Sequence, residues 1–134
     1  MARIDEIRTL AHREATRLRK AGIRTTEALL RRAATRSGRA ELSDGTGIAT
    51  ADLLRWVNFA DLMRVKGVGA EYAELLTICG VPTVPELRRR NGMTLTVKMH
   101  AVNQKKDLVH RLPTQAMVEA WIERAATLEP MVRH

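Results

Sequence analysis

Apolar residues recur along most of the chain at steps of three and four positions, the spacing that places them on one face of a helix. Gly22 is the stop signal after the first such series, which is Ile4, Ile7, Ala11, Ala15 and Leu18. This region is either one helix or a helix with a kink or short turn near Leu10. The last series follows Pro113-Thr114 and consists of Met117, Val118, Trp121, Ile122, Ala125 and Leu128. The pattern predicts an all-α protein without a sheet, with a core built from helix faces.

Residues that start and stop helices divide the chain between these two series. The predicted helix starts, in order, are Thr25 or Thr26, Thr50, Ala70, Thr83, Thr94 and Pro113-Thr114. The clearest is Thr83-Val84-Pro85-Glu86, which combines a capping box with a proline in the first turn. We expect Ser37-Gly38 to interrupt the second helix and Asp44-Gly45-Thr46-Gly47 to form a turn, because such clusters break helices. Between them the sequence predicts only a short helical turn, at 39–42.

An internal repeat becomes visible when the chain is compared with itself at an offset of 58 residues. Six positions match without a gap: Ala15, Leu18, Gly22, Ile23, Thr25 and Leu29 correspond to Ala73, Leu76, Gly80, Val81, Thr83 and Leu87. The repeated turn of glycine, an apolar residue, any residue and threonine favours a duplication over chance matching of apolar positions. The sequence therefore predicts two related helical halves.

A distinctive local motif starts the second half. The segment Val65-Lys66-Gly67-Val68-Gly69, continuing through Ala73 to Leu76, resembles the helix-hairpin-helix pattern. Two glycines permit positive φ and close backbone approach, Val68 fills the gap between the helices, and Ala73 lets the helices cross tightly. Accordingly we expect residues 1–64 to form a degenerate first half with a basic N-terminal region, residues 65–134 to form the second half, and both to make one compact unit.

The resemblance implies that the hairpin grips one nucleic-acid strand without reading its sequence. Amides at the start of the following helix make an anion site together with the helix dipole, and such a site contacts phosphates rather than base edges. Lys66 adds a direct positive charge. The candidate nucleic-acid-binding residues here are Lys66, Gly67, Val68 and Gly69.

The motif departs from strongly DNA-binding hairpins immediately after its second glycine. Lys or Arg is usual there, but this chain has Glu71 and Glu74. Over residues 61–76 two basic residues stand against three acidic ones, a balance of −1. Carboxylates beside a phosphate oppose its binding unless they point away, so a purely architectural hairpin is an equal alternative.

The positive charge of the chain is concentrated near its N-terminus. The formal net charge is +8; residues 1–40 hold 11 basic and 4 acidic residues, giving +7, and residues 41–134 hold 12 and 11, giving +1. The first half has Thr9-Leu10-Ala11-His12-Arg13 where the second has its hairpin, so it lacks both glycines. Arg13, Arg17 and Arg24 follow and are candidate phosphate contacts, because neutralising phosphates releases condensed counterions. A solvated surface that keeps the protein soluble is the alternative.

A wider resemblance is carried by the run from Leu53 to Arg64, by Gly69 to Leu76, and by Leu108-Val109-His110-Arg111-Leu112-Pro113-Thr114 with the later Val118 to Ile122. These segments resemble an uncharacterised bacterial domain-of-unknown-function family of tandem helix-hairpin-helix proteins, distantly similar to the helical DNA-binding domain of flap endonucleases. The resemblance implies a tandem, SAM-like helical bundle. It implies no substrate, since fold alone does not define function.

The remaining chemistry gives no sign of catalysis. The 15 acidic residues are scattered singly, so the converging carboxylates of a metal-dependent nuclease are not apparent, and the four histidines form no pair at helical ligand spacing. Cys79 is the only cysteine, which fits a reducing compartment, and no secretory signal or membrane span is apparent at the N-terminus. We expect no catalytic or metal site, no cofactor and a cytoplasmic location.

These observations lead to two hypotheses of different classes. The first is a non-enzymatic protein that binds nucleic acid, DNA in particular, through backbone phosphates and without sequence preference. The second is a module for protein interaction or for self-association into a homo-oligomer, in which the hairpin is architectural. The local acidity around Glu71 favours the second, and the basic region at 1–40 favours the first.

Overall fold

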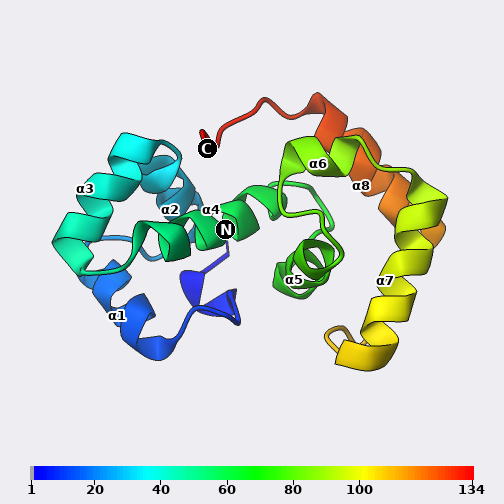
Figure 1. Cartoon of the computed structure of the whole chain (residues 1–134), viewed down its shortest axis with the longest axis horizontal. Coiled ribbons are helices and arrows are strands. Elements are labelled where there is room, and N and C mark those ends of the chain that lie inside the picture. Colours follow the sequence, from blue (N-terminus) through cyan, green and yellow to red (C-terminus); the bar gives the residue numbers. More distant parts are fainter. Residues whose placement is uncertain (1) are drawn as a thin grey trace. The chain divides into compact units, whose positions relative to one another are not determined.

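A computed structural model describes residues 2–134 of the chain (Figure 1). Its described part contains no strand, only one isolated bridge between Arg3 and Thr25. The elements are η1 (Ile4–Glu6), α1 (His12–Lys20), α2 (Thr26–Ala33), α3 (Arg36–Thr46), α4 (Thr50–Leu62), α5 (Ala70–Ile78), α6 (Val84–Arg88), α7 (Gly92–Lys106) and α8 (Gln115–Thr127). The prediction of an all-α protein is confirmed.

The helices form two compact units. Unit 1 runs up to Asp61 and also includes Met131–His134, whereas unit 2 is Leu62–Pro130. Within unit 1, α2 packs against α3 and η1 against α1. Within unit 2, α8 packs against α6 and α7, and α5 packs against α7.

The apolar series found in the sequence supply the cores of the two units. In unit 1 all members of the first series except Ala11 are buried. In unit 2 the last series contributes Val118, Trp121 and Ala125. Burial of an aromatic or aliphatic side chain of this size contributes about 1.5–3 kcal/mol, so these faces hold each helix in place.

Threonine caps start several of the helices as predicted. The hydroxyl oxygens of Thr25, Thr83 and Thr114 each accept the backbone N–H three residues later, at 3.1–3.2 Å. Each cap satisfies one of the N–H groups that a helix start leaves without an intrahelical acceptor. Thr94 is not a cap, however, because Asn91 Oδ1 accepts the N–H of Thr94 at 3.0 Å and α7 begins at Gly92.

Helix α3 is longer than the sequence suggested, and the expected break at Ser37-Gly38 is wrong. Thr35 Oγ1 accepts the N–H of Gly38 at 3.0 Å, so Ser37 and Gly38 lie in the first turn of a capped helix. The expected turn at 44–47 is also mostly helical, since α3 continues to Thr46. A cap made by Thr35 outweighs the low helix propensity of one glycine, which costs about 1 kcal/mol.

The turn between α1 and α2 has the same backbone geometry as the turn between α5 and α6, 58 positions later. Gly22 and Gly80 both lie in the left-handed region, with φ of +87° and +86°, where a side chain is strained. In each turn the residue after the glycine donates its N–H to a carbonyl five positions earlier, at 2.9 Å: Ile23 to Leu18 and Val81 to Leu76. Thr25 and Thr83 then cap the next helix. The offset found in the sequence therefore corresponds to matching local geometry.

Within residues 2–134 no helix combines the length and the apolar character needed to cross a membrane.

Candidate nucleic-acid interface

The hairpin before α5 consists of two tight turns that bury their apolar residues. The N–H of Val65 donates to Leu62 O at 3.1 Å, and the N–H of Val68 donates to Val65 O at 3.0 Å. Val65 and Val68 are buried, whereas Lys66 and both glycines are exposed. As the pattern predicted, the residue between the two glycines is part of the core.

Gly67 is the hairpin residue that only glycine fits. Its φ is +97°, and a Cβ added there would lie 2.9 Å from Trp121 Nε1 and 3.3 Å from Arg124 Nη1. Gly69, in contrast, has φ −87° and ψ −175°, and a Cβ there would meet nothing within 4 Å. The two glycines therefore differ: the first allows helix α8 to approach the backbone, and the second leaves the start of α5 open.

Helix α8 fixes the hairpin through two side chains that the sequence motif does not contain. The Trp121 ring packs against the Tyr72 ring of α5, with centroids 5.0 Å apart, and the Tyr72 hydroxyl donates to Arg111 O at 2.7 Å. Arg124 Nη1 donates to Lys66 O at 2.7 Å. These contacts make the hairpin a supported part of unit 2.

Arg124 changes the charge balance that the sequence suggested around the hairpin. Residues 61–76 contain two basic and three acidic residues, and adding the exposed Arg124 makes three of each. Glu71 and Glu74 are both half-buried, whereas Lys66 is exposed. Two of the three positive groups, Lys66 and Arg124, are therefore exposed, whereas none of the three acidic groups is. No local sequence signal points to Arg124, because it lies in α8, which starts at Gln115, far from the hairpin along the chain.

The corresponding turn in unit 1 makes the same hydrogen bonds without glycines. The N–H of Ile7 donates to Ile4 O at 3.1 Å and the N–H of Leu10 donates to Ile7 O at 3.0 Å, each 58 positions before its counterpart. Thr9 stands in the place of Gly67, and Asp107 is the only non-glycine residue at 2–134 with positive φ. The turn is thus retained while the left-handed residue is lost.

The candidate arginines of unit 1 lie on different segments. Arg13 is exposed in the first turn of α1, and Arg24 is exposed between α1 and α2. Arg17 is half-buried, with Nη1 3.7 Å from where a Cβ on Gly47 would stand, at the end of α3. A cation at a helix C-terminus is favoured by the dipole, so Arg17 has a structural role as well.

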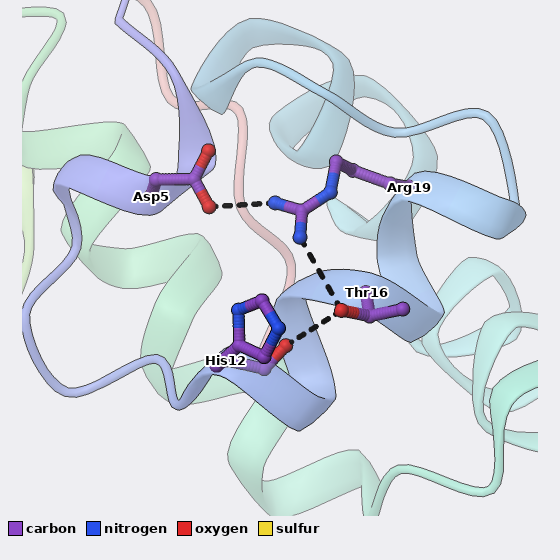
Figure 2. Close-up of polar contacts among 4 residues, drawn as sticks. All are labelled: Asp5, His12, Thr16 and Arg19. Atoms are coloured by element: carbon purple, nitrogen blue, oxygen red, sulfur yellow. Dashed lines mark hydrogen bonds and ion pairs between the residues drawn. The ribbon is translucent and has the colours of Figure 1, made fainter.

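Arg24 belongs to a small basic pocket that sequence reasoning missed. The pocket has a volume of about 260 Å³ and is lined by Arg3, Asp5, Arg19, Arg24 and Thr25. Figure 2 shows Arg19 extending from α1 to Asp5 of η1 and to Thr16, at 2.6 Å and 3.3 Å. Arg3 and Arg19 are far apart in the sequence and outside any motif, so only the folded chain brings them together. Within residues 2–134 no group of three or more His, Cys, Asp or Glu side chains is placed to hold a metal ion.

The fold and these sites define a small helical domain with two similarly built turns. Comparison with protein families assigns this domain to a family. A family model described as a domain of unknown function (DUF4332) matches residues 8–128. The chain belongs to this family, which is uncharacterised. No curated protein and no solved structure shows significant similarity to the chain.

Proposed function

We propose that this protein binds nucleic acid, DNA in particular, through backbone phosphates, without catalysis and without sequence preference. The observation that carries the proposal is the accessible start of α5, where Gly69 leaves open space and Lys66 is exposed beside it. First-turn amides of a helix lack intrahelical acceptors and carry partial positive charge, so a phosphate oxygen is a suitable partner. The Arg124 side chain adds another positive group close to Gly67.

The arginines of unit 1 supply most of the proposed electrostatic attraction. Residues 1–40 carry a net charge of +7, and Arg13 and Arg24 are both exposed. Attraction of this kind weakens with salt because counterions are released when phosphates are neutralised. Each unit contributes its own surface in this proposal: Arg13, Arg17 and Arg24 in unit 1, and Lys66, Gly67, Val68 and Gly69 in unit 2.

The same proposal includes the fold relationship implied by the sequence. We infer that the two units are tandem copies of a helix-hairpin-helix element, as in the helical domain of flap endonucleases, with the first copy degenerate. Support comes from the shared hydrogen bonds at an offset of 58, and from the paired left-handed glycines Gly22 and Gly80. The proposal explains why a turn at 7–11 persists without the glycines of its counterpart.

Fluorescence anisotropy with labelled duplex and single-stranded DNA tests the binding. We expect micromolar or weaker affinity that falls steeply between about 50 and 200 mM salt. Gly69→Glu should weaken binding by about fivefold or more, because it places a carboxylate at the phosphate position. Gly45→Glu is the matched control, since Gly45 is also exposed with open space around it, but in α3.

Three results would contradict the proposal: absence of binding at low salt, binding that is indifferent to salt, or equal weakening by Gly69→Glu and Gly45→Glu. Thermal melting of both variants establishes that they are folded. Lys66→Ala supplies an independent check, because removing one phosphate contact reduces the slope of log affinity against log salt by roughly one.

Self-association is the second candidate, and a different surface favours it. Met93 and Val97 are 59% and 65% exposed, and they lie one turn apart on the same face of α7. We propose that a second copy of the chain covers this face if the hairpin is purely architectural. Light scattering over a concentration series tests this: Val97→Glu should abolish any dimer, and Lys105→Glu on the same helix should not. A monomer at all concentrations would exclude it.

A further inference from the structure

We propose that the basic pocket of unit 1 binds a terminal phosphate group, which is present as a monoester at a nucleic-acid strand end and in a free nucleotide, and as the free ion in inorganic phosphate. The pocket is lined by Arg3, Asp5, Arg19, Arg24 and Thr25. It shares Arg24 with the surface proposed for unit 1 but no residue with the hairpin at 65–69, and the inference does not depend on the function proposed for the hairpin.

The backbone holds two of the arginines side by side. Arg3 and Thr25 form an antiparallel bridge, the N–H of Ile4 donates to Arg24 O at 3.1 Å, and the N–H of Thr26 donates to Ala2 O at 3.0 Å. The segment before η1 is thus paired with the segment before α2. Arg3 and Arg24 consequently start from fixed positions, and less conformational freedom is lost when both contact one ligand.

The third arginine is oriented by its own contacts. Arg19 Nη1 donates to Asp5 Oδ1 at 2.6 Å and Nη2 donates to Thr16 Oγ1 at 3.3 Å (Figure 2). Its side chain is 27% exposed. A guanidinium has five N–H donors, so these two bonds leave three for a ligand. Arginine is suited to phosphate because its planar fork binds two oxygens at once.

Charge and size both favour a small dianion. Three guanidinium groups and the Asp5 carboxylate give the pocket a net charge of +2, and a phosphate monoester carries about −1.5 to −2 near pH 7. Glu6 also lies close, since its Oε2 accepts the N–H of Arg3 at 2.9 Å; including it leaves +1. The volume of about 260 Å³ is below that of pockets for drug-sized ligands. The pocket therefore suits an anionic group rather than a whole cofactor.

Comparison with unit 2 indicates that the geometry of the α1–α2 turn does not require these arginines. The positions 58 residues after Arg3, Arg19 and Arg24 are occupied by Asp61, Thr77 and Pro82. The α5–α6 turn nevertheless has the same geometry as the α1–α2 turn, as shown by its left-handed glycine and its threonine cap. Three positive charges that the turn does not need, gathered around one cavity, are better explained by an anionic ligand.

Nuclear magnetic resonance titration of the full chain with inorganic phosphate, in low-salt buffer, tests the pocket directly. We expect saturable shifts of the Arg19 and Arg24 guanidinium signals at millimolar phosphate. Arg24→Gln and Arg19→Gln should each weaken binding by about fivefold or more, because each removes a charged donor. Asp5→Asn should strengthen it by a few-fold, because it removes the carboxylate that competes for Arg19. Lys105→Gln, which removes one exposed positive charge from α7, is the control and should have no effect.

The source of the phosphate group is identified with strands of one sequence that carry either a 5′-phosphate or a 5′-hydroxyl. Tighter binding of the phosphorylated strand, lost in Arg24→Gln, assigns the pocket to strand ends. Saturable phosphate binding without that preference assigns it to free phosphate or nucleotides.

The proposal is overturned if phosphate gives no saturable shift up to about 10 mM, or if Lys105→Gln weakens binding as much as Arg24→Gln does. Because Arg24 is exposed, its variant keeps the test valid even if Arg19→Gln destabilises the fold. Gly69→Glu should leave the phosphate titration unchanged, so failure of the hairpin proposal is distinguishable from failure of this one.

Discussion

Arg124 of α8 donates a hydrogen bond of 2.7 Å from Nη1 to the carbonyl oxygen of Lys66, and thereby ties the exposed hairpin to the body of unit 2. Because the bond is solvent-exposed, we expect Arg124→Met to lower the free energy of unfolding by only about 0.5–1.5 kcal/mol. The local effect should be larger than the global one, with faster hydrogen exchange at the Val68 amide. Arg124→Lys keeps the charge without the planar fork, so it separates charge from hydrogen bonding. Unchanged exchange at Val68 in Arg124→Met would show that this contact does not support the hairpin.

The two glycines of the hairpin should respond differently to the same change. Gly67→Ala introduces a Cβ at φ +97° and 2.9 Å from Trp121 Nε1, so we expect it to destabilise unit 2 by about 1–3 kcal/mol. Gly69→Ala meets open space at an ordinary φ and should change stability by no more than about 0.5 kcal/mol. Urea denaturation of the two variants provides the measurement. Equal losses would mean that the close approach of Trp121 is not what requires Gly67.

These contrasts show which features the sequence could predict. The hairpin, the turns at Gly22 and Gly80 and the caps at Thr25 and Thr83 depend on residues within a few positions of one another, so their signals are local. Helical spacing accounts for the burial of Ala15 and Leu18 in α1 and of Val118, Trp121 and Ala125 in α8. Ile4 and Ile7 are also buried, but they lie in η1 and in the segment between η1 and α1 rather than on the face of one long helix. The break expected at Ser37-Gly38 was wrong because a cap made by Thr35 holds both residues in the first turn of α3. The cap expected at Thr94 was wrong because Asn91, three positions earlier, caps α7 instead.

The parts of the candidate sites that the sequence did not reveal come from residues distant along the chain. Arg124 reaches the hairpin from α8, and Arg3 is brought close to Arg24 because a backbone bridge pairs Arg3 with Thr25. No spacing rule connects such residues, because their proximity is set by how helices pack. The sequence alone therefore suggested a net negative hairpin, whereas the folded unit balances it with Arg124.

Burial gives Cys79 a pH-dependent effect on stability. The side chain is fully buried, and burial raises the pKa of its thiol, although the nearby Lys98 and Arg90 charges act in the opposite direction. A thiol whose pKa is higher in the folded state contributes stability below its unfolded pKa, near 8.5–9, and that contribution is lost as the pH rises through the folded pKa. Urea unfolding of the wild type and of Cys79→Ala between pH 7 and pH 10.5 checks this. The stability difference between the two should shrink with rising pH, and a constant difference would contradict the prediction.

Arg39 holds the segment Met131–His134 against unit 1 through backbone carbonyls. Arg39 is only 3% exposed. Its Nη1 donates to Ala33 O at 2.9 Å and to Ala34 O at 3.1 Å, and its Nη2 donates to Arg133 O at 2.5 Å. Ala33 and Ala34 are at the C-terminal end of α2, where the helix dipole favours a cation. Burial, followed by the neighbouring Arg36 charge, lowers the pKa of Arg39, yet a guanidinium stays charged in proteins.

Replacing Arg39 should therefore free the segment and destabilise the unit. We expect Arg39→Met to reduce the free energy of unfolding by roughly 2–4 kcal/mol, because it removes a charged donor from the buried carbonyl of Ala33 and from the partly buried carbonyls of Ala34 and Arg133. The N–H of Arg133, which donates to Ala34 O at 2.7 Å, should lose its protection from hydrogen exchange. Arg39→Lys should rescue little, since an ammonium group does not reproduce the planar fork that reaches three carbonyls. Arg36→Met is the matched control: Arg36 is exposed and its Nε donates only to His134 O among the carbonyls of this segment, so its loss should cost about 0.5 kcal/mol. Retained protection of the Arg133 amide in Arg39→Met would show that apolar packing, rather than Arg39, holds this segment in place.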